Sequence, residues 1–167
     1  MVKKLPKSDP RYERRSTDRD VGDDLESLRA FIDGKNRWIL STTRRDGRPQ
    51  MSLVSGGMTA AGELAIASYP SRVKVKNAKA NPDVSVLVMG EAFHNEWIQI
   101  DGTARVYDMP EAADGLVEYF RCISGEHPDW DEYRQAMEDQ DKSVILIDVT
   151  RWSPASKGGF PPELFED

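Results

Sequence analysis

Apolar residues alternate with polar ones, or form short unbroken runs, at six places along this 167-residue chain. Runs of this length that are rich in β-branched and aromatic residues and bounded by Gly, Pro or Asp are typical of β-strands. Six short strands at close spacing favour an antiparallel barrel over a parallel sheet. The predicted strands are residues 37–43, 49–55, 63–68, 84–89, 97–107 and 144–149.

Local signals predict how the strands are joined and where they bend. Asp46 and Gly47 form the Asp-Gly pair that is typical of a tight hairpin between the first two strands. The Gly56-Gly57 pair predicts a break after the second strand, because glycine weakens strand interiors. Gly102 predicts a bulge within the long fifth strand.

A helical spacing of apolar residues occurs in three further segments. The first helix is predicted to open at Asp23-Asp24 and to end at Gly34. The second follows Pro110, and the third runs over residues 129–137 with Asp129 as its cap. The apolar faces of the first two comprise Leu25, Leu28, Phe31 and Ile32, and Ala113, Leu116, Val117, Phe120 and Ile123.

The segment between the third and fourth strands is rich in cations and has no acid. Ser71 is predicted to cap a short helix there, and the free N–H groups of a first helical turn favour an anion. Arg72 and Lys74 would lie in that turn, Lys76 and Lys79 lie further along, and Asn81-Pro82 ends the helix. The segment is therefore a candidate phosphate site, although a solvated cationic helix face explains the same residues.

Composition narrows the function classes. The net charge is −6, but residues 108–167 carry −10 while residues 1–20 carry +3, and so large an acidic region disfavours nucleic acid as a partner. One cysteine, Cys122, and two histidines, His94 and His127, leave little for a metal site. The sequence shows neither a membrane span nor a signal peptide, so we expect a cytoplasmic protein that does not bind membranes.

The same patterns divide the chain into three parts. Residues 1–20 form a basic arm with too few apolar residues to pack, which predicts disorder. Residues 21–152 contain all the predicted strands and helices and form one domain, the predicted barrel. Residues 153–167 form an irregular tail rich in Pro and Gly.

Several of these motifs occur in an order that resembles a known family. The motifs are Asp46-Gly-Arg-Pro-Gln-Met-Ser52, Ser71-Arg-Val-Lys-Val-Lys-Asn77, Asn81-Pro-Asp, Gly102-Thr-Ala, and the segment at residues 125–134. Together they resemble the pyridoxamine 5′-phosphate oxidase-like split β-barrel superfamily. Within it they look most like the actinobacterial class B flavin/deazaflavin oxidoreductases that use coenzyme F420. The resemblance implies a mainly β fold with flanking helices, the FMN-binding split barrel, assembled as a homodimer with a cofactor groove between protomers.

The resemblance also implies which residues hold the cofactor. Arg72 and Lys74 would bind its phosphate, assisted by Ser68 and Asn77. Gln50 and Ser52 would border the isoalloxazine-like ring, and Trp97 would reach the ring or substrate from the partner subunit. No catalytic residue is assigned, although Tyr69 and His94 are conceivable proton donors.

The implied reaction is hydride transfer from reduced F420 to a small organic acceptor. F420 carries a phosphodiester and an oligoglutamate tail. The tail could contact Lys76, Lys79 or the hairpin residues Arg44, Arg45 and Arg48; the alternative is that these cations are simply solvated. One alternative is an FMN-binding oxidoreductase of the same fold. The other is a non-catalytic protein that binds a cofactor, or haem through His94 or His127.

Overall fold

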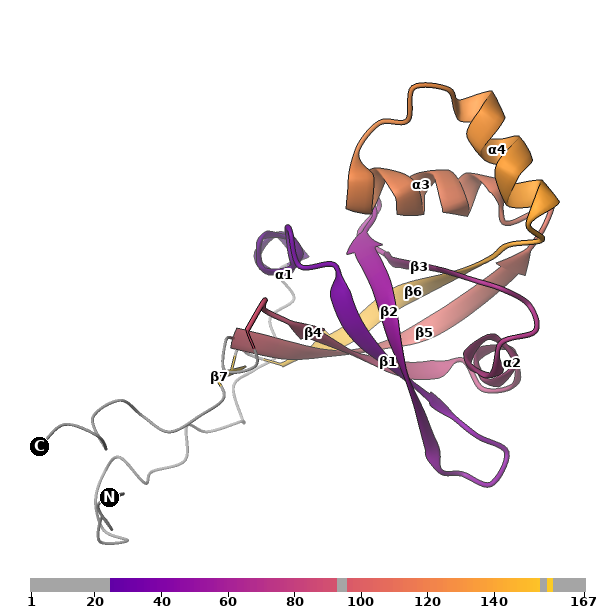
Figure 1. Cartoon of the computed structure of the whole chain (residues 1–167). Coiled ribbons are helices and arrows are strands. Elements are labelled where there is room, and N and C mark those ends of the chain that lie inside the picture. Colours follow the sequence, from indigo (N-terminus) through magenta and orange to yellow (C-terminus); the bar gives the residue numbers. More distant parts are fainter. Residues whose placement is uncertain (1–24, 93–95, 154–155, 158–167) are drawn as a thin grey trace, which may run out of the picture.

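The computed structural model describes residues 25–92, 96–153 and 156–157. Within them the chain forms seven strands and four helices (Figure 1). The strands are β1 (Arg37–Thr43), β2 (Pro49–Met58), β3 (Leu64–Ser68), β4 (Asp83–Met89), β5 (Glu96–Asp108), β6 (Ser143–Trp152) and β7 (Ser156–Lys157). The helices are α1 (Leu25–Ile32), α2 (Val73–Ala80), α3 (Ala113–Ser124) and α4 (Trp130–Asp139).

Strands β1 to β6 close into an antiparallel barrel. The order is β4-β1-β2-β3-β6-β5, and β5 also pairs with β4, which closes the ring. The register shifts between Asp101 and Gly102 where β5 pairs with β6, as expected for the predicted bulge. A mainly β barrel with flanking helices is therefore confirmed. The short strand β7 pairs with the start of β5, so the predicted irregular tail contains one ordered pairing.

The barrel interior is filled by alternate residues of its strands. In β1 the inward residues are Trp38, Leu40 and Thr42, and the odd-numbered residues face outward. Because residues that pair across strands share a face, β2 contributes Val54, Ser52 and Gln50 opposite them. The inner face of β2 thus becomes polar toward the β1–β2 hairpin.

Strand β2 runs straight through Gly56 and Gly57, so the predicted break there is wrong. A side chain at Gly56 would lie 2.3 Å from the indole ring of Trp38, and one at Gly57 would lie 2.4 Å from Cβ of Cys122. The two glycines therefore bring the strand into contact with the core on one face and with α3 on the other. Their presence reflects close packing rather than a turn.

Strands β2 and β3 pair only briefly and then diverge. Their register covers Gly56–Met58 with Leu64–Ile66, whereas β2 as a whole is ten residues long. Helix α2 lies beside the diverging strands and buries Val75 and Ala78. It contacts β1, β5 and, less extensively, β2 (Figure 1). The barrel is consequently split along one edge of β2.

Helices α3 and α4 form a pair over one end of the barrel (Figure 1). Helix α3 begins at Ala113, three residues beyond Pro110, and Asp129 caps α4 by accepting from the N–H groups of Asp131 and Glu132, as predicted. Tyr133 joins the two helices because its hydroxyl donates to the carbonyl of Leu116 at 3.0 Å. The helix pair is thus a compact unit beside the barrel.

Helix α1 differs from its prediction in one residue. Leu28 and Ile32 are buried, but Leu25 is 45% exposed and does not share their environment. Gly34 ends the helix at a φ of 69°, as predicted for a left-handed terminus. The predicted opening at Asp23-Asp24, the basic arm and residues 158–167 lie outside the described residues.

Candidate functional site

The split leaves one edge of β2 without a strand partner among the described residues. The N–H of Gly56 donates to the carbonyl of Asn36 at 3.1 Å, so the even-numbered residues of β2 bond toward β1. The backbone groups of Met51 and Leu53 therefore point into the split. Gln50 lies at this edge too, because its Nε2 donates to the Met51 carbonyl at 2.8 Å. A planar polar ligand would find backbone donors and acceptors along this edge.

A hydrogen-bond network centred on Thr42 joins three of the predicted site residues. Nδ2 of Asn77 donates to the Thr42 hydroxyl at 3.1 Å, and that hydroxyl lies 3.1 Å from Oε1 of Gln50. Nε2 of Gln50 also donates to the Ser52 hydroxyl at 2.8 Å. The network fixes α2 against β1 and β2. Thr42, which is 1% exposed, was missed from the sequence although it is a polar residue at an inward strand position.

Cations gather where α2 begins, but the predicted cap is wrong. The residue that precedes the helix is Arg72 rather than Ser71, and no side chain of the described residues caps the first turn. Without a capping side chain, the first N–H groups of α2 remain available to an anion. The apolar Val73, 55% exposed, separates Arg72 from Lys74.

The surroundings of Lys74 disfavour the charged form of its side chain. Burial lowers the pKa of Lys74, and the positive charge of Arg72 lowers it further. Within the described residues no carboxylate forms an ion pair with Lys74. An anionic ligand at this position would supply the missing counter-charge.

Ser68 is the third element of the candidate phosphate site. It ends β3, is only 4% exposed, and its hydroxyl has no hydrogen-bond partner among the described residues. Buried hydroxyl groups are normally hydrogen-bonded, and an unpaired one calls for an explanation such as a bound water, ion or ligand. Ser68 is followed by the Tyr69–Arg72 turn, which is closed by the Arg72 N–H donating to the Tyr69 carbonyl at 3.0 Å.

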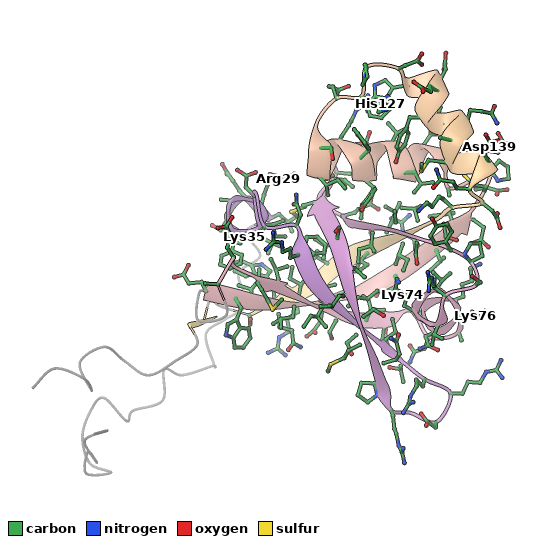
Figure 2. The ribbon with its side chains drawn as sticks, viewed as in Figure 1. Arg29, Lys35, Lys74, Lys76, His127 and Asp139 are labelled. Carbon is green, nitrogen blue, oxygen red and sulfur yellow. The ribbon has the colours of Figure 1, made fainter. Side chains whose placement is uncertain are left out.

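The other two cations of the segment lie in different environments. Lys76 is exposed, whereas Lys79 forms an ion pair with Asp108. That pair and a 2.7 Å bond from the Ser143 hydroxyl tie the end of α2 to the ends of β5 and β6. Figure 2 shows Lys74 and Lys76 on α2, on the side of the barrel away from Arg29 and Lys35. Lys79 is thus engaged within the chain.

Trp97 does not join the other predicted site residues within one chain. It pairs with Met89 at the far end of β4, and Met89 lies beside the Arg37 end of β1. Thr42 is five residues further along β1, on the order of 17 Å away at the usual strand rise. Trp97 also faces outward, because its neighbour Ile98 is buried. Trp97 therefore lies apart from the Thr42 region within one chain.

The alternative candidates from the sequence lie elsewhere. His127 contacts Phe120, Trp130 and Tyr133 in an aromatic cluster on the helix pair, and its Nδ1 accepts from the Asp129 N–H at 3.1 Å. Cys122 is half-buried on α3, and burial raises the pKa of its thiol. His94 lies outside the described residues. The described part of the chain has no cluster of acidic, His and Cys residues suited to a metal, and none of its helices could span a membrane.

The predicted residues other than Trp97 occupy connected parts of one region. Arg72, Lys74 and Ser68 flank the start of α2 and supply cations, helix N–H groups and a hydroxyl that has no hydrogen-bond partner within the described part of the chain. Gln50 and Ser52 lie on the β2 strand that borders the split, joined to α2 through Thr42 and Asn77. This donor set fits a ligand with a phosphate at one end and a flat polar ring at the other.

Comparison with known proteins assigns the family. The sequence model of pyridoxamine 5′-phosphate oxidase matches residues 25–155. The chain belongs to this family. Its fold is accordingly the split barrel of that family. The cation-rich turn at the start of α2 and the β2 edge that borders the split form the candidate site of this barrel.

Solved structures of the same fold differ in function. The conserved hypothetical protein Rv2991 from Mycobacterium tuberculosis has a TM-score of 0.67 at 18% identity, over 85% of this chain and 89% of that one. An F420 reductase has a TM-score of 0.56 at 22% identity, over 80% of this chain and 98% of that one. A haem-binding protein from Mycobacterium smegmatis has a TM-score of 0.59 at 16% identity, over 80% of this chain and 57% of that one. At these identities the similarity concerns the fold alone.

Proposed function

We propose that this protein is an oxidoreductase that binds coenzyme F420 along the β2 edge and at the start of α2, and reduces a small organic acceptor. The observation that carries the proposal is the cationic turn at Arg72 and Lys74 beside the Ser68 hydroxyl, for which the described residues provide neither a carboxylate nor a hydrogen-bond partner. The match to an oxidoreductase family, and a neighbour of the same fold described as an F420 reductase, support it.

The chain's own residues would bind and orient the cofactor. Arg72 and Lys74 would donate charge-assisted hydrogen bonds to the phosphate, and the Ser68 hydroxyl would add a neutral one. Gln50 and Ser52, held in place through Thr42, would border the ring at the β2 edge. When bound, F420 supplies hydride chemistry; the protein supplies position and excludes water.

We further propose that the active form is a homodimer. The outer face of β1, β2, β4 and β5 carries Met51, 67% exposed, and Leu53, 82% exposed, and Trp97 lies on the same face. A second chain on this face would bury these residues and could bring its Trp97 to the cofactor. Sedimentation velocity is expected to give the mass of two chains, and the mass of one chain would contradict the dimer.

The decisive experiment is a fluorescence titration of cofactor-free protein with F420 and, separately, with FMN. F420 should bind at micromolar or lower concentration and more tightly than FMN. The variant with both Arg72→Ala and Lys74→Ala should bind F420 at least tenfold more weakly, because hydrogen bonds to charged groups contribute about 1.5–3 kcal/mol each. The variant Lys35→Ala is the control, since Lys35 lies beside α1, on the side of the barrel away from Lys74.

Other outcomes would redirect the assignment. Preference for FMN would favour an FMN oxidoreductase of the same fold, because FMN needs the phosphate site but no site for an acidic tail. Binding of F420 without turnover of any acceptor would favour a carrier. The haem alternative gains little from the described residues, because His127 is packed among Phe120, Trp130 and Tyr133 on the helix pair.

A further inference from the structure

Lys142 lies beside the candidate phosphate site although it is distant in sequence. Strands β3 and β6 pair up to Ser68 with Ser143, and one step further the same antiparallel register places Tyr69 opposite Lys142. The side chains agree with the register, because Nζ of Lys142 lies 3.8 Å from the centroid of the Tyr69 ring. The turn between α4 and β6 thus brings a cation to the same turn that carries Arg72.

Tyr69 is shared by two cations. The guanidinium carbon of Arg72 lies 6.0 Å from the centroid of the ring over which Lys142 is placed. No more than about 10 Å can therefore separate the charged groups of Arg72 and Lys142. The face of an aromatic ring attracts cations, but it does not neutralise them as a carboxylate would. Two positive charges within about 10 Å of each other make this turn attractive to an anion.

The position of Lys142 is fixed by its backbone. Its N–H donates to the carbonyl of Met137 at 3.1 Å, and the next residue, Ser143, is fully buried and bonded to Asp108. The nearby acid Asp108 is itself engaged by Lys79, and within the described residues no carboxylate forms an ion pair with Lys142. The Lys142 backbone and its contact with Tyr69 therefore hold the cation next to the candidate phosphate site, where no described carboxylate pairs with it.

We propose that Tyr69 and Lys142 form a second anion subsite, which receives a carboxylate of the cofactor's acidic tail. The proposal rests on the proposed function, since it takes the phosphate of F420 to be bound by Arg72 and Lys74. The tail continues from that phosphate, so its first carboxylates remain close to Arg72 and meet Lys142 across the Tyr69 ring. FMN has no such group, so the subsite is a source of selectivity between the two cofactors.

The test compares F420 with a form of F420 from which the glutamates have been removed. Wild-type protein and Lys142→Ala are titrated with both, with binding followed by cofactor fluorescence. Lys142→Ala should weaken binding of intact F420 about threefold to fivefold, the range of a partly exposed ion pair. Binding of the shortened form should change little, and Lys142→Arg should restore the affinity for intact F420.

A matched control separates charge from packing. Lys35 also lies over an aromatic ring, with its Nζ 4.5 Å from the Phe31 centroid, but it is beside α1. Lys35→Ala should therefore bind both cofactor forms as the wild type does. Equal weakening of both forms by Lys142→Ala, or no weakening of either, would overturn the subsite while leaving the proposed function intact. Failure of the wild type to bind either form would overturn the proposed function, and the subsite with it.

Discussion

Thr42 is the residue whose replacement most directly tests how the site is organised. Its hydroxyl accepts a hydrogen bond from Asn77 and donates to Gln50, both at 3.1 Å. Valine has the same shape but cannot make either bond, so Thr42→Val removes the link between α2 and the two strands without creating a cavity. The fold and the packing of the core should otherwise be retained.

The expected losses follow from those two bonds. A neutral hydrogen bond contributes about 0.5–1.5 kcal/mol to stability, so Thr42→Val should lower the free energy of unfolding by about 1–3 kcal/mol. For a chain of this size that corresponds to a decrease in Tm of about 2–12 °C. F420 affinity should fall roughly fivefold or more, because Gln50 and Asn77 must then be ordered on binding at about 0.5–1.5 kcal/mol each.

The assay measures thermal unfolding by circular dichroism and F420 binding by fluorescence on the same samples. Thr43→Val is the matched control, because Thr43 is the next residue of β1 and faces outward. It should change neither quantity substantially. Wild-type affinity in Thr42→Val would refute the view that this network positions the site, and wild-type stability would show that the network contributes nothing to the fold.

Two further predictions concern the scaffold. Gly56→Ala should lower the free energy of unfolding by about 1–3 kcal/mol or more in urea titrations, because its Cβ would lie 2.3 Å from the buried Trp38 ring. Ser55→Ala, at an exposed neighbouring position, is the control and should leave the free energy of unfolding unchanged. Equal effects of the two substitutions would contradict the packing argument. The hydrogen bond from Lys79 lowers the pKa of Asp108, so its contribution to stability is complete above the unfolded-state pKa of about 3.9 and is lost as the pH falls through the lower folded-state value. Asp108→Asn should thus have a lower urea midpoint than wild type at pH 7 and nearly the same midpoint at pH 2; a pH-independent difference would rule out this charge effect.

The strands and most of their connections could be predicted from the sequence because their signals are local. The alternation in β1 defines its bounds, Asp46-Gly47 forms the expected hairpin, and Asp129 caps its helix. The Gly56-Gly57 pair was misinterpreted for the opposite reason. Glycine is required there by Trp38 and Cys122, which approach from distant parts of the chain. Such a contact cannot be predicted from the pattern of neighbouring residues in the sequence.

The candidate site was predictable only in part for the same reason. Arg72 and Lys74 occur in one short motif, so their proximity follows from the sequence alone. The network through Thr42 depends on β1, β2 and α2 meeting, and Lys142 reaches Tyr69 only through the pairing of β3 with β6. Ser71 appeared to be a cap because serine is common at that position, but the helix begins one residue later than expected.

The cations around Tyr69, which form no ion pair among the described residues, have a consequence for the lifetime of the protein. A ligand that binds only the folded state raises its stability by about 2.7 kcal/mol when present at a hundred times its Kd. Arg72 disfavours the charged form of Lys74, and a bound anion would offset that repulsion. The folded fraction, and with it resistance to proteolysis, would then follow the supply of cofactor. Phosphate buffers would mimic part of this effect and obscure it during purification.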